Sequence, residues 1–209
     1  MFFYHPLIRL GVATFVLVAL IQPTSALAWS FGSVLPSEEA ETPIAEWTAK
    51  EGDAFIVDTK TNMGYLVHPD RGYTSFPVVT GQRRAVRYIG RTYNATTPVR
   101  SWSSGDIHVK RDFTTFGSRG IFIRLFHEGE KTPYGIHSHK YVDVMMARDD
   151  RFGSMGCVIV TEEILDIILD TYAKNADTLA VVTEYGLTDA KVNFEVLKEI
   201  ANRSSIPQG

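Results

Sequence analysis

One cysteine and a nearby pair of histidines are the residues of this chain that could carry out covalent chemistry. Cys157 is the only cysteine in the 209 residues, and it follows Ser154-Met155-Gly156. A cysteine acts as a nucleophile in its thiolate form, which a neighbouring imidazole can generate by accepting the thiol proton. The candidate imidazole is His137, in the run Gly135-Ile136-His137-Ser138-His139. A glycine beside the nucleophile also lets backbone amides approach a developing oxyanion, so the pattern indicates acyl transfer through a thiol.

Two other interpretations of the same residues stay open. A single cysteine ahead of Val158-Ile159-Val160 is also typical of a small buried hydrophobic residue. His139 lies two residues from His137, so on a strand both rings would point to one face and either could be the base. Such a pair, with Cys157 or His127, could instead bind zinc. We expect a thiol enzyme with His137 as the base and no metal, because zinc would quench the thiol.

A β-rich domain is predicted to position these residues. Short apolar or alternating runs separated by turn residues predict strands, and Lys60-Thr61-Asn62 predicts the turn of a hairpin. The predicted strands cover residues 54–58, 63–68, 73–80, 106–110, 120–127, 134–139, 158–160 and 179–184.

Two helices are predicted late in the chain. Thr161 can cap the first, whose apolar face contains Ile164, Leu165, Ile168 and Leu169. The second covers about residues 189–202, where apolar residues recur partly at helical spacing. The sequence therefore predicts an α+β fold, a compact mostly-β catalytic domain of sandwich or barrel type with one or two late helices.

The amino terminus predicts export. Arg9 is its only charged side chain, an apolar run covers residues 10–21, and Ala26-Leu27-Ala28 has the form of a cleavage site. The run is shorter than the ~20 residues that span a bilayer. We therefore expect a cleaved signal peptide over residues 1–28 rather than an interfacial anchor, and no stable membrane span. Residues 29–50 are expected to form a linker, residues 51–186 the catalytic domain, and residues 187–209 a C-terminal helix and tail, all in the periplasm or cell envelope.

The composition excludes several classes of protein. Hydrophobic residues make up 44% of the chain and charged residues 22%, which excludes wholesale disorder. The net charge of −3, with no stripe of Lys and Arg, predicts that nucleic acid is not a partner. A lone cysteine cannot form an internal disulfide, so in an oxidising compartment its thiol must be inert, intermolecular or chemically useful.

The histidine and cysteine motifs resemble those of the L,D-transpeptidase catalytic domain (YkuD-like), a family of bacterial enzymes that remodel peptidoglycan. The family has a histidine followed by Gly or Ser, and then Ser/Thr-x-Gly-Cys. Here His137-Ser138 precedes Ser154-Met155-Gly156-Cys157, with 16 residues between His137 and Ser154. An upstream Thr-Gly turn and a Thr-Pro dipeptide match Thr80-Gly81 and Thr97-Pro98 in the same order. The resemblance covers roughly residues 53–172.

The resemblance implies a two-step acyl transfer that needs neither a metal nor an organic cofactor. Cys157 would attack the carbonyl after the third residue of a peptidoglycan stem tetrapeptide, expel the terminal D-alanine and form a thioester. An amine of a neighbouring stem would then convert the thioester into a 3→3 crosslink. His137 would transfer the proton while the main-chain carbonyl of Ser138 orients its ring, and the amides of Gly156 and Cys157 would stabilise the oxyanion.

Three further residues of the motifs are expected to contribute to substrate binding. They are Ser154, which would position the loop, His139 and Met155. The family commonly has histidine at the position of Met155, and usually Arg or Asn at the position of Ile159. A replacement cation could come from Arg124, Arg148 or Arg151. Because water could resolve the thioester in place of an amine, an L,D-carboxypeptidase of the same family is the alternative. A catalytically inactive wall-binding module is a second one.

Overall fold

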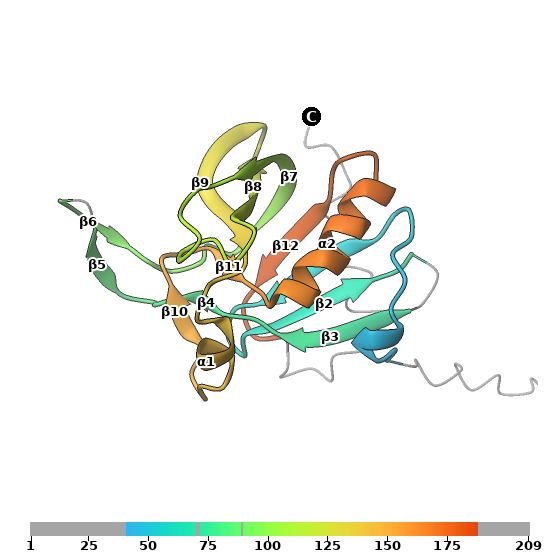
Figure 1. Ribbon diagram of the computed structural model, residues 1–209, viewed down its shortest axis with the longest axis horizontal. Coiled ribbons are helices and arrows are strands. Elements are labelled where there is room, and N and C mark those ends of the chain that lie inside the picture. Colours follow the sequence, from blue (N-terminus) through green and yellow to red (C-terminus); the bar gives the residue numbers. More distant parts are fainter. Residues whose placement is uncertain (1–40, 70–71, 89, 188–209) are drawn as a thin grey trace, which may run out of the picture. The chain divides into compact units, whose positions relative to one another are not determined.

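The computed structural model describes residues 41–69, 72–88 and 90–187, and β-strands dominate this part of the chain (Figure 1). The helices are the 3-10 turn η1 (Ile44–Glu46), α1 (Val142–Met146) and α2 (Glu162–Lys174). The strands are β1 (Ala54–Asp58), β2 (Met63–Val67), β3 (Tyr73–Pro77), β4 (Thr80–Gly81), β5 (Ala85–Tyr88), β6 (Arg91–Asn94), β7 (Arg100–Val109), β8 (Ile121–His127), β9 (Glu130–His137), β10 (Phe152–Ser154), β11 (Val158–Ile159) and β12 (Ala180–Glu184).

Eight of these strands form one sheet in the order β11-β9-β8-β7-β12-β1-β2-β3. Its neighbours are antiparallel except for two parallel pairs, β1 with β12 and β11 with β9. The sheet is curled, and its two edges meet: just after β3, Val79 exchanges two backbone hydrogen bonds of 2.9 Å with Ile159 of β11. The prediction of a mostly-β α+β domain is therefore confirmed.

Helix α2 forms where the sequence predicts it, for local reasons. The side chain of Thr161 accepts a hydrogen bond from the amide of Ile164, and Glu162 and Glu163 lie in the first turn, where the helix dipole favours acidic groups. Ile164, Leu165 and Ile168 are buried, and the helix lies against one face of the sheet (Figure 1).

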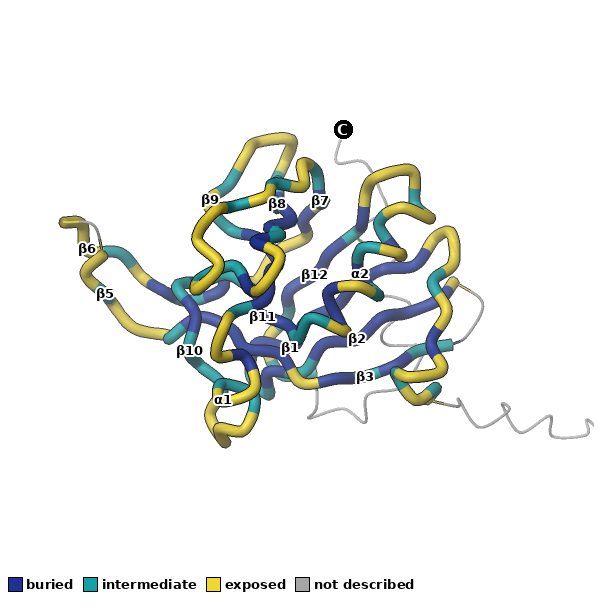
Figure 2. The backbone as a smooth tube through the Cα atoms, viewed as in Figure 1, coloured by how far each residue is buried: buried dark blue, intermediate teal, exposed yellow. Residues whose placement is uncertain are grey.

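The centre of the eight-stranded sheet is buried, whereas the separate β5–β6 hairpin is exposed. All five residues of β1 and the three central residues of β12 are buried, and most residues of the β5–β6 hairpin are exposed (Figure 2). The main core lies between α2 and the sheet, and Phe55, Leu66, Ile123, Ile136 and Leu165 are among its fully or nearly fully buried side chains.

Several predicted strands have other limits in the structure. The hairpin over 54–58 and 63–68 is confirmed as β1 and β2, but β7 begins at Arg100 rather than at residue 106. Its first half is a strand because it pairs with β12, a contact that local sequence does not reveal. Strand β9 ends at His137, so the prediction that His139 shares this strand is wrong. The β5–β6 hairpin, β10 and α1 were not predicted.

Residues 41–50, in the predicted linker, contact the domain. Trp47 is buried and stacks on His68 with 3.7 Å between the ring centroids, and Glu41 forms a β-bridge with Tyr73. The predicted signal peptide, residues 29–40 of the linker, the predicted helix over 189–202 and the remaining tail lie outside the described residues. Among the described residues, no helix has the length and apolar character needed to cross a membrane.

Candidate active site

The register of two neighbouring strands places Cys157 and His137 on the same face of the sheet. In the parallel pair of β11 and β9, Val158 lies opposite Ile136 and Ile159 opposite His137. Ile136 and Val158 are buried in the main core. Side chains alternate along a strand, so the ring of His137 and the side chain of Ile159 point to the other face. Cys157, two residues before Ile159, lies on that face too, beside the backbone of Gly135.

The two residues line one cavity of about 360 Å³, which also contains most of the other predicted site residues. Ser154, Met155 and His139 contribute to its walls, and so does Ile159. Ser138 and Gly156 do not line it. Their backbone atoms instead form hydrogen bonds with the side chains of His137 and Ser154. The structure thus brings the predicted residues together from β9, β10 and the loop before β11.

His137 has a buried ring that a carbonyl and two aromatic rings hold in place. Its Nδ1 donates a hydrogen bond of 2.6 Å to the carbonyl of Ser138, and the rings of Phe116 and Phe122 lie 5.0 and 5.8 Å from it between centroids. Burial lowers the pKa of His137 to about 4, although the backbone groups of Ser138 and Thr115 oppose this shift. The ring is therefore neutral at pH 7, with its proton on Nδ1 and a lone pair on Nε2.

Cys157 is likewise neutral. Burial raises the pKa of its thiol to about 11, while the backbone of Gly135 and the charge of Arg124 partly counteract the shift. The sequence predicts that the imidazole generates a thiolate, but these two pKa values favour a neutral thiol and a neutral imidazole in the same cavity. The physical reason is desolvation, which penalises the charged form of each group.

Alkylation of Cys157 should follow this raised pKa. With a pKa near 11, only about one thiol in 10⁴ is ionised at pH 7, and the rate constant with iodoacetamide should rise about tenfold per pH unit between pH 7 and 9. Mass spectrometry of the intact protein, in samples quenched at a series of times, measures this rate. A small free thiol serves as the reference and should begin to level off near pH 9. A plateau for Cys157 at or below neutral pH would show a preformed thiolate–imidazolium pair instead.

Ser154 fixes the loop that carries the cysteine. Its Oγ donates a hydrogen bond of 2.6 Å to the carbonyl of Cys157 and accepts one of 3.0 Å from the amide of Gly156. Gly156 has a φ of 115°, and a Cβ there would lie 2.7 Å from the ring of Tyr134, so only glycine suits this turn. The amide of Gly156 is therefore already bonded, contrary to the expectation that it faces the oxyanion. The amide of Cys157 remains the candidate donor.

Thr97 joins two turns that are far apart in the sequence. Its Oγ1 accepts a hydrogen bond of 2.9 Å from the amide of Gly81 and donates one of 3.0 Å to the carbonyl of Gly156. A Cβ on Gly81 would lie 2.1 Å from the carbonyl oxygen of Ala95, so this close approach also requires glycine. Thr97 was not predicted as a site residue, although the ordered Thr-Gly and Thr-Pro motifs were the signal that could have indicated it.

Replacing Thr97 by valine should destabilise the protein by about 1–3 kcal/mol, because the buried amide of Gly81 and carbonyl of Gly156 would lose their partner while the side chain keeps its shape. Urea unfolding measures the change. The neighbouring Thr96, whose hydroxyl bonds only to exposed Asn94, provides the matched control, and Thr96→Val should change the free energy of unfolding by less than about 0.5 kcal/mol. Equal effects of the two substitutions would contradict this role.

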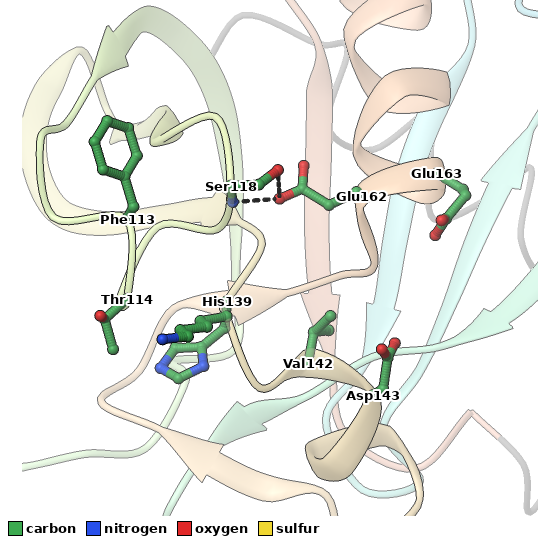
Figure 3. Close-up of a pocket in the computed structure, with 9 residues that line it drawn as sticks. Phe113, Thr114, Ser118, His139, Val142, Asp143, Glu162 and Glu163 are labelled. Atoms are coloured by element: carbon green, nitrogen blue, oxygen red, sulfur yellow. Dashed lines mark hydrogen bonds between the residues drawn. The ribbon is translucent and has the colours of Figure 1, made fainter.

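Two further cavities adjoin the site. One of about 930 Å³ lies beside the β5–β6 hairpin and shares Tyr88, Pro133, Met155 and Cys157 with the first. The other, of about 460 Å³, is lined by His139, Ser118 and Glu162 among other residues (Figure 3). There Glu162 accepts hydrogen bonds from both the amide and the hydroxyl of Ser118. His139 thus borders two cavities, and its Nδ1 accepts a hydrogen bond of 3.1 Å from the amide of Tyr141.

No zinc ligand set is formed in the described part of the chain. No three or more His, Cys, Asp or Glu side chains converge there as a metal site requires. His127, which the zinc interpretation would use, instead bonds through Nδ1 to the carbonyl of Ser101 at 3.0 Å and packs against Trp102.

Comparison with known proteins gives a low similarity. No family model matches the sequence, and no curated protein matches it. Among solved structures, the L,D-transpeptidase (residues 123–326) of Xylanimonas cellulosilytica is similar with a TM-score of 0.46 and 17% identity, covering 66% of this chain and 63% of that chain. Bd1075 of Bdellovibrio bacteriovorus is similar with a TM-score of 0.43 and 14% identity, covering 66% of this chain and 49% of that one. This chain thus spans less than two thirds of either.

Proposed function

We propose that this protein is an exported cysteine acyltransferase, an L,D-transpeptidase that acts on peptidoglycan stem peptides. One observation carries the proposal. His137 at the end of β9 and Cys157 just before β11 lie on the same side of the sheet and line one cavity, and the Ser138 carbonyl holds Nδ1 of the ring and leaves a lone pair on Nε2. A nucleophile, a base and a group that orients the base form the constellation of a thiol acyltransferase. The resemblance of the motifs supplies the substrate class.

The neutral pair implies general-base catalysis during attack rather than a preformed thiolate. As Sγ of Cys157 bonds to the donor carbonyl, its proton passes to Nε2 of His137. Collapse of the tetrahedral intermediate breaks the carbon–nitrogen bond, and the imidazolium returns the proton to the leaving amine. In the second step an acceptor amine attacks the thioester, His137 takes its proton, and the departing sulfur of Cys157 regains it. The low basicity of His137 favours the return of the proton to each leaving group.

The arrangement of cavities supports transfer to an amine over hydrolysis. Cys157 borders both the 360 Å³ cavity and the 930 Å³ cavity, so two chains can approach the same sulfur from different sides. Tyr88, Tyr93 and Tyr134 line the larger cavity, where their rings offer broad contact area at low conformational entropy cost. A carboxypeptidase needs room for only one peptide and a water molecule.

The test is to incubate the purified protein with sacculi and to identify the products by mass. A transpeptidase should produce 3→3 crosslinked dimers, whereas the carboxypeptidase alternative should produce tripeptides alone. The inactive wall-binding module should produce neither, and its Cys157 should not be acylated by a carbapenem. Protein carrying Cys157→Ala is the control for enzymes that copurify. Export is tested by fractionating cells and determining the amino-terminal residue of the mature protein, which should be Trp29.

A further inference from the structure

The cavity that holds Cys157 and His137 carries two cationic side chains and no acidic one. Arg124 and Lys110 line it, and none of its other lining residues is aspartate or glutamate. The imbalance is local, because the chain as a whole has a net charge of −3. The charge of this cavity therefore favours an anionic group on the ligand.

Arg124 is held rigidly at the wall of the cavity. It lies on β8, opposite Gly135 of β9. Its Nη1 donates a hydrogen bond of 2.8 Å to the carbonyl of Thr132, and its guanidinium carbon lies 4.5 Å from the centroid of the Phe122 ring. These contacts fix the orientation of the guanidinium, so less entropy is lost when it binds an anion.

The charge of Arg124 has no counterpart in the described part of the protein. No carboxylate there forms an ion pair with it, and its Nε is buried without a hydrogen-bond partner. A carboxylate that enters the cavity would supply the counter-charge that the guanidinium lacks. The positive charge already acts on the thiol of Cys157, so the two groups are close enough to serve one ligand.

Arg148 and Arg151 are the other two arginines that could replace the cation usually found at the position of Ile159, and the structure distinguishes Arg124 from both. Arg151 donates through Nη2 to the carbonyls of Thr61 and Asn62, and Arg148 pairs with the exposed Asp150. Neither lines the cavity. Ile159, at the position where related sequences carry a polar residue, presents only an apolar surface to the cavity.

We propose that Arg124, assisted by Lys110, binds the carboxylate of the amino acid that leaves the acyl donor. Arg124 lies two strands from Cys157, roughly 10 Å between the backbones, and the arginine side chain together with one residue of substrate can fill this gap. The site thereby selects donors whose chain ends one residue beyond the scissile carbonyl. The inference rests on the proposed function, since it assigns the donor specificity of that reaction.

The experiment compares a synthetic stem tetrapeptide as the free acid and as its C-terminal amide. Formation of the thioester on the intact protein is followed by mass. The wild-type protein should use the acid with a kcat/KM about 10- to 100-fold higher than that of the amide, as a charged hydrogen bond provides. Arg124→Gln should lose this preference, chiefly through a higher KM for the acid, so that the variant uses the acid and the amide about equally. Arg124→Lys should retain part of the preference.

Arg148→Gln is the matched control and should behave as the wild type with both peptides, because Arg148 lies outside the cavity. Equal use of acid and amide by the wild-type protein would overturn the assignment of Arg124, as would an equal loss with both peptides in Arg124→Gln. If no thioester forms with either peptide, the proposed function fails. Calorimetry then tests Arg124 by itself, since the wild-type protein should still bind the acid more tightly than the amide and Arg124→Gln should not.

Discussion

Replacing Cys157 by alanine should abolish acyl transfer, with a fall in kcat/KM of about a thousandfold or more. Loss of a covalent nucleophile removes the whole reaction path, and what remains is the small contribution of binding and of the oxyanion donors. Cys157→Ser should be nearly as inactive, because His137 is a weak base with a pKa of about 4 and a hydroxyl is much less acidic than a thiol. The measurement is thioester formation and product release with a stem tetrapeptide.

The stability of these variants decides whether the loss is chemical. Cys157 is partly buried, and its hydroxyl or methyl replacement changes few contacts, so the free energy of unfolding should change by no more than about 1 kcal/mol. A folded Cys157→Ala protein that still forms product would contradict the assigned nucleophile. A folded wild-type protein that forms no thioester would favour the inactive wall-binding module.

The elements that follow from local signals could be predicted from the sequence. Helix α2 has its cap at Thr161 and an apolar face at helical spacing, and the β1–β2 hairpin has its turn at Asn62, whose φ of 56° suits asparagine. The first half of β7 could not be predicted, because Ser101-Trp102-Ser103-Ser104 has few residues that favour strands. It becomes a strand through pairing with β12, which lies more than 70 residues later in the chain.

In the candidate site, too, some features follow from local sequence and others depend on tertiary structure. The sequence predicts that the strand of His137 stands beside the turn of Cys157, and the parallel pairing of β9 with β11 places both residues at one cavity. The low pKa of His137 could not be predicted, since it depends on burial of the ring, against which Phe116 and Phe122 from other segments pack. Arg124 could not be selected from three candidates without the register of β8 against β9. Tertiary pairing, rather than residue type, decides these features.

Replacing His137 by glutamine should both slow acyl transfer and make the protein more resistant to acid. The rate should fall by about 10²- to 10⁴-fold, because no other group would accept the thiol proton from the same position. The effect on stability follows from the pKa of about 4, against 6.5 for an ordinary histidine. Between pH 6.5 and pH 4 the imidazole of His137 is protonated in the unfolded chain but stays neutral in the folded protein. The free energy of unfolding therefore decreases as the pH falls.

The size of this acid effect can be calculated and isolated. On going from pH 7 to pH 4, His137 should contribute a loss of about 3 kcal/mol to the wild-type free energy of unfolding, and His137→Gln should lack that contribution. Denaturant titrations at a series of pH values measure the difference, in which the other titrating groups cancel. Cys157→Ala is the matched control and should keep the wild-type acid dependence, because a thiol with a pKa near 11 is neutral throughout this range. If the free energies of unfolding of the wild type and of His137→Gln differ by the same amount from pH 7 to pH 4, the imidazole is solvated. A solvated ring would have an ordinary pKa, and the argument for a neutral thiol and a neutral imidazole would fail.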